Sequence, residues 1–192
     1  MPKPIGVLAL QGDVREHRLA FSRIGVDTLE VKHASQLAEI RGLVLPGGES
    51  TVIEKLCKIY GLFEPIRASI ATGLPVFGTC AGLIMLANDI EDSIPGQEGF
   101  GGLDAVVRRN AFGHQVDSFE ADINFTGIDG TVHAAFIRAP LIESVGPGVE
   151  IVSELEDGRI VGVRQGNLLG ISFHPEVTGE DRIHRLFDTM CA

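Results

Sequence analysis

A cysteine lies between two glycines at the point where an expected buried strand ends and a helix begins. The segment Gly78-Thr79-Cys80-Ala81-Gly82 follows the apolar run 74–78 and precedes a helical pattern over residues 83–88. It is the thiol form of the G-x-S-x-G nucleophile elbow, in which the glycines permit a tight turn that lifts the central side chain above the sheet. The start of the following helix favours a thiolate. Cys80 is therefore the candidate nucleophile, and a buried structural cysteine in a glycine turn is the alternative.

A histidine and a glutamate two residues apart supply a candidate base and a group to orient it. His174 follows the apolar run 168–173, and Pro175 separates it from Glu176. Residues two apart in an extended segment point the same way, so we expect Glu176 to fix the imidazole tautomer and stabilise its charged form. Taken alone, the three residues are more typical of a structural histidine at a strand end, but the cysteine elbow favours catalysis. The remaining histidines lack such a nearby partner and are expected to be surface or core residues: His17, His33, His114, His133 and His184.

Paired glycines occur in Pro46-Gly47-Gly48-Glu49-Ser50, between an expected strand over 42–45 and a helix beginning near Thr51. Consecutive backbone N–H groups in such a loop can stabilise an oxygen that becomes negative. A turn without a ligand is the alternative. The loop lacks the G-K-[ST] ending of a phosphate-binding loop, and no G-x-G-x-x-G follows the first strand, so nucleotide sites are not expected. Neither an H-E-x-x-H motif nor carboxylates at ligand spacing are present, and we predict no metal and no cofactor.

Strands and helices alternate in the first half of the chain, which predicts a mostly parallel sheet. The expected strands there are 5–10, 28–31, 42–45 and 74–78, and the expected helices are 14–24, 35–40, 51–60, 63–72 and 83–88. From residue 103 strands dominate, at 116–119, 131–137, 150–155, 160–164 and 168–172, and turn residues between some of them suggest hairpins. A last helix over 181–191 follows a capping-box-like start at Thr178.

The predicted fold is an α/β domain with three layers. Its central sheet is mostly parallel, helices cover both faces, and antiparallel strands are added in the C-terminal half. Residues 1–192 are expected to form one domain, since no repeat, low-complexity tract or linker interrupts them. Parallel strands would bring Cys80, His174 and the Gly47-Gly48 loop to one carboxyl edge, where such folds bind ligands. Together these groups indicate acyl transfer through a thioester.

Composition excludes several other classes of function. Of 192 residues, 16 are basic and 26 acidic, which gives a net charge of −10 and disfavours binding to nucleic acid or to an anionic membrane. The three cysteines are too few and too scattered for a disulfide framework, and no C-x-x-C pair is present. Cys57 and Cys191 are expected to be structural, the latter at a frayed C-terminus. Without a signal-peptide pattern or a membrane span, the expected location is the cytoplasm.

Several motifs together resemble those of the class I glutamine amidotransferases. The motifs are Gly-Gly-Glu-Ser at 47–50, Gly-Thr-Cys-Ala-Gly at 78–82 and His-Pro-Glu at 174–176. More narrowly, the chain resembles the glutaminase subunits of pyridoxal 5′-phosphate synthases. That closer match is carried by Leu-Gln-Gly at 10–12, Arg-Glu-His at 15–17, Arg-Asn-Ala-Phe-Gly at 109–113, Asp-Ser-Phe-Glu at 117–120 and Ile-Arg-Ala-Pro at 137–140.

The resemblance implies a role for each matching residue. Cys80 is the nucleophile, His174 the base and Glu176 its orienter. The oxyanion hole is formed by Gly47, Gly48 and Ala81, and L-glutamine is held by Gly48, Glu49, Ser50, Arg109, Ile137 and Arg138. An arginine suits this work because its planar fork grips a carboxylate in two places. Gln11 belongs either to a partner interface or to the oxyanion hole.

The resemblance also implies a partner, a separate barrel-shaped synthase subunit that receives the ammonia and builds pyridoxal 5′-phosphate. Because glycines tolerate both signs of φ, the Gly47–Gly48 peptide is a candidate switch that this partner sets. Two departures from the family pattern are visible: His114 replaces an arginine found in many members, and the glycine loop at 97–102 is slightly longer. The alternatives are a glutaminase for another synthase such as one making imidazole glycerol phosphate, a cysteine peptidase or stress protein, and a catalytically silent subunit.

Overall fold

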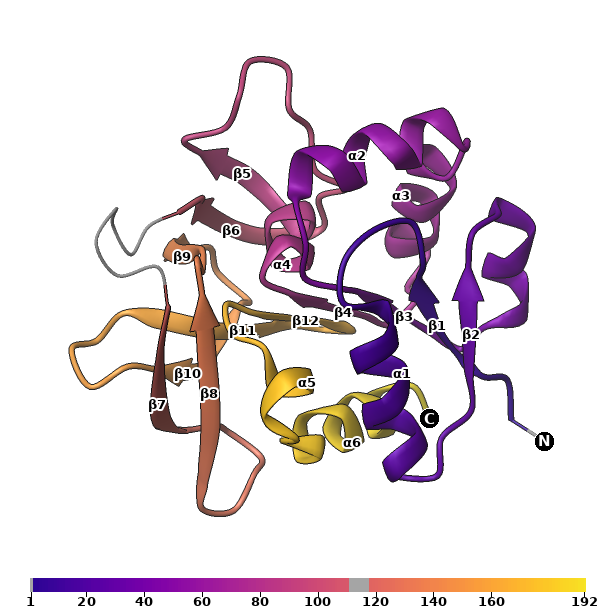
Figure 1. The fold of residues 1–192 in the computed structure, drawn as a ribbon. Helices are drawn as coiled ribbons and strands as arrows, with labels where there is room; N and C mark the ends of the chain where they lie inside the picture. Colours follow the sequence, from indigo (N-terminus) through magenta and orange to yellow (C-terminus); the bar gives the residue numbers. More distant parts are fainter. Residues whose placement is uncertain (1, 111–117) are drawn as a thin grey trace.

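A computed structural model describes residues 2–110 and 118–192 (Figure 1). Within them the strands are β1 (Ile5–Leu8), β2 (Thr28–Val31), β3 (Gly42–Leu45), β4 (Val76–Thr79), β5 (Ala87–Glu91), β6 (Leu103–Arg108), β7 (Ser118–Asn124), β8 (Thr131–Ile137), β9 (Leu141–Val145), β10 (Glu150–Glu154), β11 (Ile160–Gln165) and β12 (Leu168–Ile171). The helices are α1 (Val14–Arg23), the 3-10 helix η1 (Ala34–Glu39), α2 (Ser50–Ile59), α3 (Phe63–Ala71), α4 (Ala81–Leu86), α5 (Pro175–Thr178) and α6 (Asp181–Met190).

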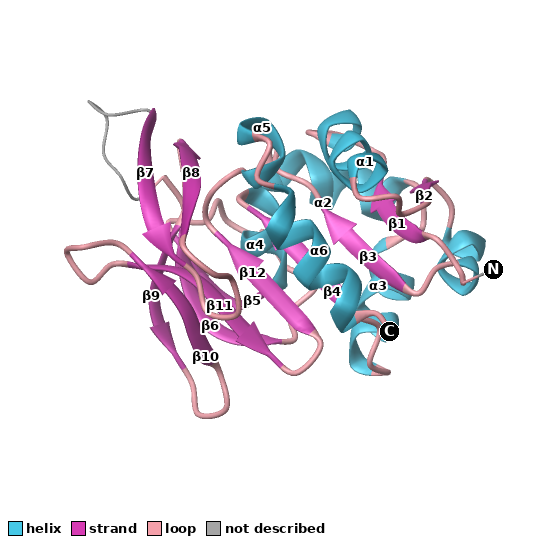
Figure 2. Ribbon diagram, turned by 90° about the horizontal axis from the view of Figure 1, so that it is seen from below, coloured by secondary structure: helices cyan, strands magenta, loops and turns pink. Residues whose placement is uncertain are grey.

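One large sheet runs through the described part of the chain. Its strand order is β2-β1-β3-β4-β12-β11-β9-β6-β5, and β10 pairs with β11. The pairs from β2 to β12 are parallel, whereas β11 and β9 join antiparallel to their neighbours. A separate antiparallel pair, β7 and β8, stands beside it (Figure 2). The predicted fold, a mostly parallel sheet with antiparallel strands added in the C-terminal half, is confirmed.

Helices cover both faces of the parallel strands and enclose two cores (Figures 1 and 2). Successive residues of a strand point to opposite faces, so Leu43 and Leu45 of β3 join one core and Val44 joins the other. The first core is completed by apolar residues of α2, α3 and α4, and the second by residues of α1 and α6 such as Phe21 and Phe187. Burial on both faces explains why these strands are continuous apolar runs.

The elements differ from the expectations at several places. The helix expected over 83–88 runs from Ala81 to Leu86, because β5 begins at Ala87. Strands β5, β6 and β9 were not predicted, although buried and exposed residues broadly alternate along β6. The strand expected over 116–119 corresponds to β7 from Ser118, while residues 116 and 117 lie outside the described residues.

The expected capping box at Thr178 is wrong. Thr178 is the last residue of α5, and its hydroxyl donates to the carbonyl oxygens of His133 and Pro175. Glu180 caps α6 instead, and its carboxylate accepts the N–H of Arg182. The short helix α5 occupies the residues that the box would have needed. None of the described helices is long and apolar enough to cross a membrane.

Candidate active site

The cysteine elbow forms as expected, at the carboxyl end of β4. Cys80 has φ 50° and ψ −104°, a conformation that non-glycine residues rarely adopt. Its N–H donates to the carbonyl oxygen of Ile171 on β12 (2.9 Å). The flanking glycines are required by close approach, because a Cβ at Gly78 would collide with the backbone of Gly82, and one at Gly82 with that of Leu45. The turn is thus locked between β4, β3 and β12.

His174 contacts Glu176 as expected, but the backbone that joins them is helical where an extended segment was expected. His174 Nδ1 lies 2.7 Å from Glu176 Oε1, and both side chains are buried. The segment is not extended: Pro175 begins α5, so Glu176 is in the first helical turn. Proline suits that position because its missing N–H would have no helical partner. The turn of the helix brings the carboxylate back to the imidazole.

Asp13 is a site residue that the sequence analysis missed. Its Oδ2 lies 3.3 Å from His174 Nδ1, and its backbone N–H donates to the carbonyl oxygen of Gly47 (3.0 Å). It precedes α1, after β1, and so stands at the same carboxyl edge as the other three loops. An acidic residue between the first strand and its helix was the available signal.

The electrostatics of the site favour a protonated His174. Burial alone lowers the pKa of His174, but interactions with Asp13, Cys80 and Glu176 outweigh it and raise that pKa above its ordinary value. Burial raises the pKa of Glu176, and the contact with His174 opposes this rise. An imidazole that holds its proton next to a thiol stabilises the thiolate.

The other two cysteines lie within the apolar cores. Burial raises the pKa of Cys57 and of Cys191 to about 12, so both remain thiols at neutral pH. Cys57 lies in the first core and Cys191 in the second. Their structural role was expected, but Cys191 is a buried residue that ends α6 and does not lie in a frayed terminus.

His17 and His184 are core residues, as expected, but they are not without partners. His17 Nδ1 lies 2.9 Å from His184 Nε2, and His17 Nε2 lies 3.1 Å from Thr79 Oγ1. The same Nε2 is 3.6 Å from Glu176 Oε1. His133 is exposed and contacts the carboxylates of Asp122 and Glu120, whereas His114 lies outside the described residues.

The Gly47-Gly48 loop packs directly against His174 and Gln11. A Cβ at Gly47 would collide with the His174 ring, and one at Gly48 with the Gln11 side chain. Gln11 Oε1 accepts the N–H of Glu49 (2.9 Å). Neither Gly47 nor Gly48 has a positive φ, so close packing accounts for the glycines in this conformation. Ala81, the third expected oxyanion residue, is the first residue of α4, where backbone N–H groups have no helical acceptor.

Three of the expected glutamine-binding residues form one polar chain with a fourth that was not expected. Glu49 Oε1 lies 3.0 Å from a guanidinium nitrogen of Arg109, whose other terminal nitrogen donates to Gln97 Oε1 (3.0 Å). Gln97 Nε2 in turn donates to Ser50 Oγ (3.0 Å). Gln97 begins the glycine loop at 97–102, in which no site residue was expected. The chain forms a polar wall beside the Gly47-Gly48 loop.

Ile137 and Arg138 come from the two-stranded sheet. The carbonyl oxygen of Ile137 lies 4.0 Å from Cys80 Sγ, which places the end of β8 beside this thiol. The backbone N–H of His174 also donates to the carbonyl oxygen of Ala135 on β8 (2.9 Å), which holds β8 beside the site. Arg138 has φ 43° and is exposed, and it forms no ion pair with any residue in the described ranges. Its guanidinium is therefore available to donate hydrogen bonds to a carboxylate.

Asp13, His174 and Glu176 also place one ligand atom each within 4.8 Å of one another, the only such group in residues 2–110 and 118–192. Hydrogen bonding to His174 Nδ1 accounts for this arrangement, because both carboxylates approach the same ring nitrogen. The contact set is that of an oriented base, and we assign no metal to it.

Comparisons with known proteins found similar sequences and a similar structure. A protein of Parafrankia sp. (strain EAN1pec) named pyridoxal 5′-phosphate synthase subunit PdxT is 61% identical over 184 residues, which span 95% of this chain and 90% of that protein. The protein of the same name from Frankia alni is 56% identical over 95% of this chain and 92% of its own length. A crystal structure of a glutamine amidotransferase superposes with a TM-score of 0.92 and 47% identity, over 97% of this chain and 98% of that one.

The family itself is matched along almost the whole chain. The profile of the SNO glutamine amidotransferases covers residues 7–192, a range that includes the elbow, the paired glycines and the His-Pro-Glu segment. The resemblance drawn from the motifs is thereby confirmed. The chain belongs to the SNO glutamine amidotransferase family.

Proposed function

We propose that this chain hydrolyses L-glutamine to L-glutamate and ammonia and delivers the ammonia to a synthase subunit that makes pyridoxal 5′-phosphate. The observation that carries the proposal is the Cys80 elbow at the same sheet edge as the buried His174–Glu176 pair. The names of the relatives from Parafrankia and Frankia support the choice of synthase.

The site residues divide the reaction into two acyl transfers. The Cys80 thiolate attacks the carboxamide carbon, and His174 gives its proton to the departing amine. The amine leaves as ammonia, and the acyl group remains on Cys80 as a thioester. Water then attacks the thioester, His174 takes the proton of that water, and glutamate leaves as the Cys80 thiolate is restored. Glu176 keeps the imidazole in position through both steps. Backbone N–H groups of the Gly47-Gly48 loop and of Ala81 would stabilise the oxyanion.

Recognition of glutamine is assigned to the polar wall and to the end of β8. The exposed Glu49 carboxylate suits the α-amino group. The Arg138 guanidinium, which has no ion-pair partner among residues 2–110 and 118–192, suits the α-carboxylate. Arg109 is already paired with Glu49 and Gln97, so we assign it to holding Glu49 in place. Ile137 stands beside Cys80, and Ser50 accepts a hydrogen bond from Gln97 and so helps to hold the polar wall.

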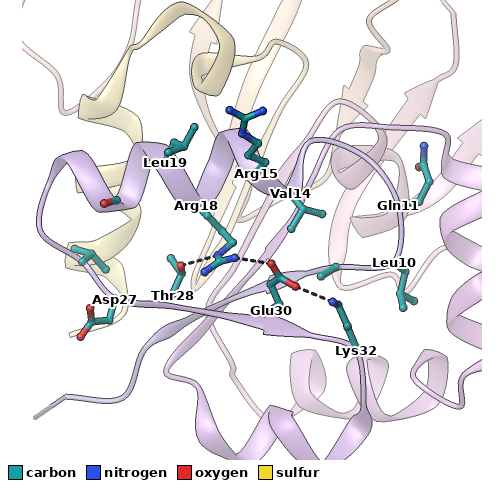
Figure 3. Close-up of a pocket in the computed structure, with 13 residues that line it drawn as sticks. Leu10, Gln11, Val14, Arg15, Arg18, Leu19, Asp27, Thr28, Glu30 and Lys32 are labelled. Carbon is teal, nitrogen blue, oxygen red and sulfur yellow. Dashed lines mark hydrogen bonds and ion pairs between the residues drawn. The ribbon is translucent and has the colours of Figure 1, made fainter.

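The partner is proposed to be a barrel-shaped synthase subunit that docks near Gln11. A hollow beside α1 and β2 begins at Leu10 and Gln11 and continues past Val14 and Arg18 (Figure 3). Because Gln11 holds the N–H of Glu49 and packs on Gly48, a protein in contact with this hollow would touch the oxyanion loop. Docking could thus set the orientation of the Gly47–Gly48 peptide by binding one orientation more tightly.

The test is steady-state release of glutamate by the purified chain, with and without its synthase subunit. We expect the partner to raise turnover by about 10²–10³-fold, the usual worth of one oxyanion donor. Equal turnover in both assays would contradict the switch. Hydrolysis of a general peptide substrate, with no glutamate release in either assay, would contradict the glutaminase and favour a cysteine peptidase.

A further inference from the structure

The side-chain amide of Gln97 stands between two residues of the polar wall. Its Oε1 accepts from a terminal nitrogen of Arg109 (3.0 Å), and its Nε2 donates to Ser50 Oγ (3.0 Å). Ser50 is buried, Gln97 is half-buried, and only 12% of the Arg109 side chain is exposed. The proposed reaction assigns no part to this amide, although it joins two of the residues expected to hold glutamine.

The segment between β5 and β6, which carries Gln97, is anchored on α2 (Figure 1). The backbone N–H of Glu98 donates to Glu54 Oε1 (3.1 Å). Lys58 Nζ lies 2.8 Å from the same Glu54 oxygen and 3.1 Å from the Glu98 carboxylate. Phe100, further along the segment, is buried in the first core. Because its neighbours are fixed in this way, Gln97 reaches the wall from a defined position.

The chemistry of its partners decides how the Gln97 amide is oriented. A guanidinium carries only N–H donors and no acceptor, so the amide oxygen must face Arg109. The amide NH₂ group then faces Ser50, and because that group can only donate, Ser50 Oγ accepts. The proton of the Ser50 hydroxyl is not used in this contact. It has no acceptor among the described residues.

An unused hydroxyl proton at a buried position fits a ligand that brings an acceptor oxygen. Ser50 is 2% exposed and begins α2 directly after Glu49, the residue to which the α-amino group of glutamine is assigned. Glutamine offers acceptor oxygens in its α-carboxylate and in its carboxamide. The wall therefore has a direction, which runs from the donors of Arg109 through the Gln97 amide to a hydroxyl that is free to donate to the substrate.

We propose that Gln97 is a positioning residue for glutamine recognition. Its amide, oriented by Arg109, makes Ser50 Oγ an acceptor and so reserves the Ser50 proton for an oxygen of the bound substrate. Gln97 thereby sets the affinity for glutamine through Ser50 and not through a contact of its own. The inference rests on the proposed function for the identity of the substrate.

The direction of the wall can be reversed by a substitution of nearly the same shape. Gln97→Glu keeps an acceptor for Arg109, but both of its terminal oxygens accept, so the Ser50 hydroxyl must donate to the new carboxylate. Its proton is then lost to the substrate. Asn88→Asp is the matched control, because it makes the same change from amide to carboxylate beside the same loop. Asn88 Oδ1 accepts the N–H of Gly102 (2.9 Å), which a carboxylate oxygen can also do.

Binding and turnover are measured separately, on the complex of the full chain with its synthase subunit. The Kd of L-glutamine is determined by isothermal titration calorimetry in a Cys80→Ala background, and KM and kcat for glutamate release are determined with Cys80 present. We expect Gln97→Glu to raise Kd and KM roughly tenfold with little change in kcat, since one hydrogen bond to the substrate is lost. Asn88→Asp should leave all three constants unchanged.

A double variant separates the direction of the wall from a simple effect of charge. Ser50→Ala should itself raise Kd roughly tenfold, because it removes the same hydrogen bond. If Gln97 acts through Ser50, adding Gln97→Glu to Ser50→Ala raises Kd no further. An equal further rise in the Ser50→Ala background would show that the new carboxylate repels glutamine directly, and it would overturn the proposal.

Two other results would also overturn it: an unchanged Kd in Gln97→Glu, or a matching rise in Asn88→Asp. Circular dichroism on each variant checks that the fold is retained. Binding of L-glutamine without glutamate release from any chain that has Cys80 would refute the proposed hydrolysis and leave the role of Gln97 standing. No binding of L-glutamine with Gln97 and Ser50 both intact would refute the proposed function and this inference together.

Discussion

The parallel and antiparallel parts of the sheet contribute differently to the site. Cys80, His174 and Glu176 follow β4 and β12, and no more than 7% of any of the three is exposed. Ile137 ends β8 of the separate antiparallel pair, Arg138 follows it, and both are exposed. The groups proposed for bond making are thus fixed by strands buried on both faces, whereas groups proposed for recognition stand at an accessible rim. Chemistry requires desolvated, immobile partners, and recognition requires access.

The largest expected effect separates Cys80 from the other cysteines. Cys80→Ala should lower turnover roughly 10⁴-fold or more, because no other thiol stands at the sheet edge. Cys57→Ala, the matched control, should keep most of its kcat, since that thiol is buried in the first core. Steady-state glutamate release and circular dichroism on both variants check this. Near-normal turnover by Cys80→Ala would remove the parallel edge from the mechanism.

The next effect concerns the charge behind the base. Glu176→Gln preserves shape but removes the charge that stabilises the imidazolium, so kcat should fall by about 10²–10⁴-fold while KM for glutamine changes little. With that charge gone, the pKa of His174 falls. The fall in kcat and the fall in the pKa of His174 are both measured from pH–rate profiles. A large rise in KM with unchanged kcat would instead make Glu176 a glutamine ligand.

A smaller effect is expected at the accessible rim. Arg138→Met should raise KM for glutamine by roughly 10–100-fold, the worth of a hydrogen bond to a charged group, and change kcat by only a few fold. Arg185→Met, an exposed arginine on α6, is the control and should change neither constant. A fall in kcat without a change in KM would show that the two parts of the sheet do not divide the work as described.

The site residues that could be predicted from the sequence are those whose positions depend on local backbone structure. A turn or a helix start is indicated by the glycines around Cys80, by the Gly47-Gly48 pair and by Pro175. The alternation of strands and helices then places these segments at one edge of the sheet. The contact between His174 and Glu176 was predicted from an extended backbone, yet a helical turn produces it. The prediction was correct in its contact and wrong in its conformation.

What the sequence did not disclose depends on tertiary packing. His17 and His184 are separated by 167 residues, and only the packing of α1 on α6 joins them. Gln97 similarly reaches Arg109 and Ser50 from a loop whose composition indicates no fixed structure. Strand β9 pairs with β6 across more than thirty residues of intervening chain, so no neighbouring turn announces it. In each case the missing information is a long-range side-chain or strand partner.

The unusual backbone of Cys80 has a consequence for how the chain can change over generations. A non-glycine residue in such a φ/ψ region costs of order 1–3 kcal/mol, and glycine would avoid most of that cost. Replacing Cys80 with glycine would therefore relieve this strain and remove the thiol of the proposed reaction. Selection for backbone stability alone would not favour a cysteine at this strained position, which is the pattern expected of a residue kept for the proposed reaction.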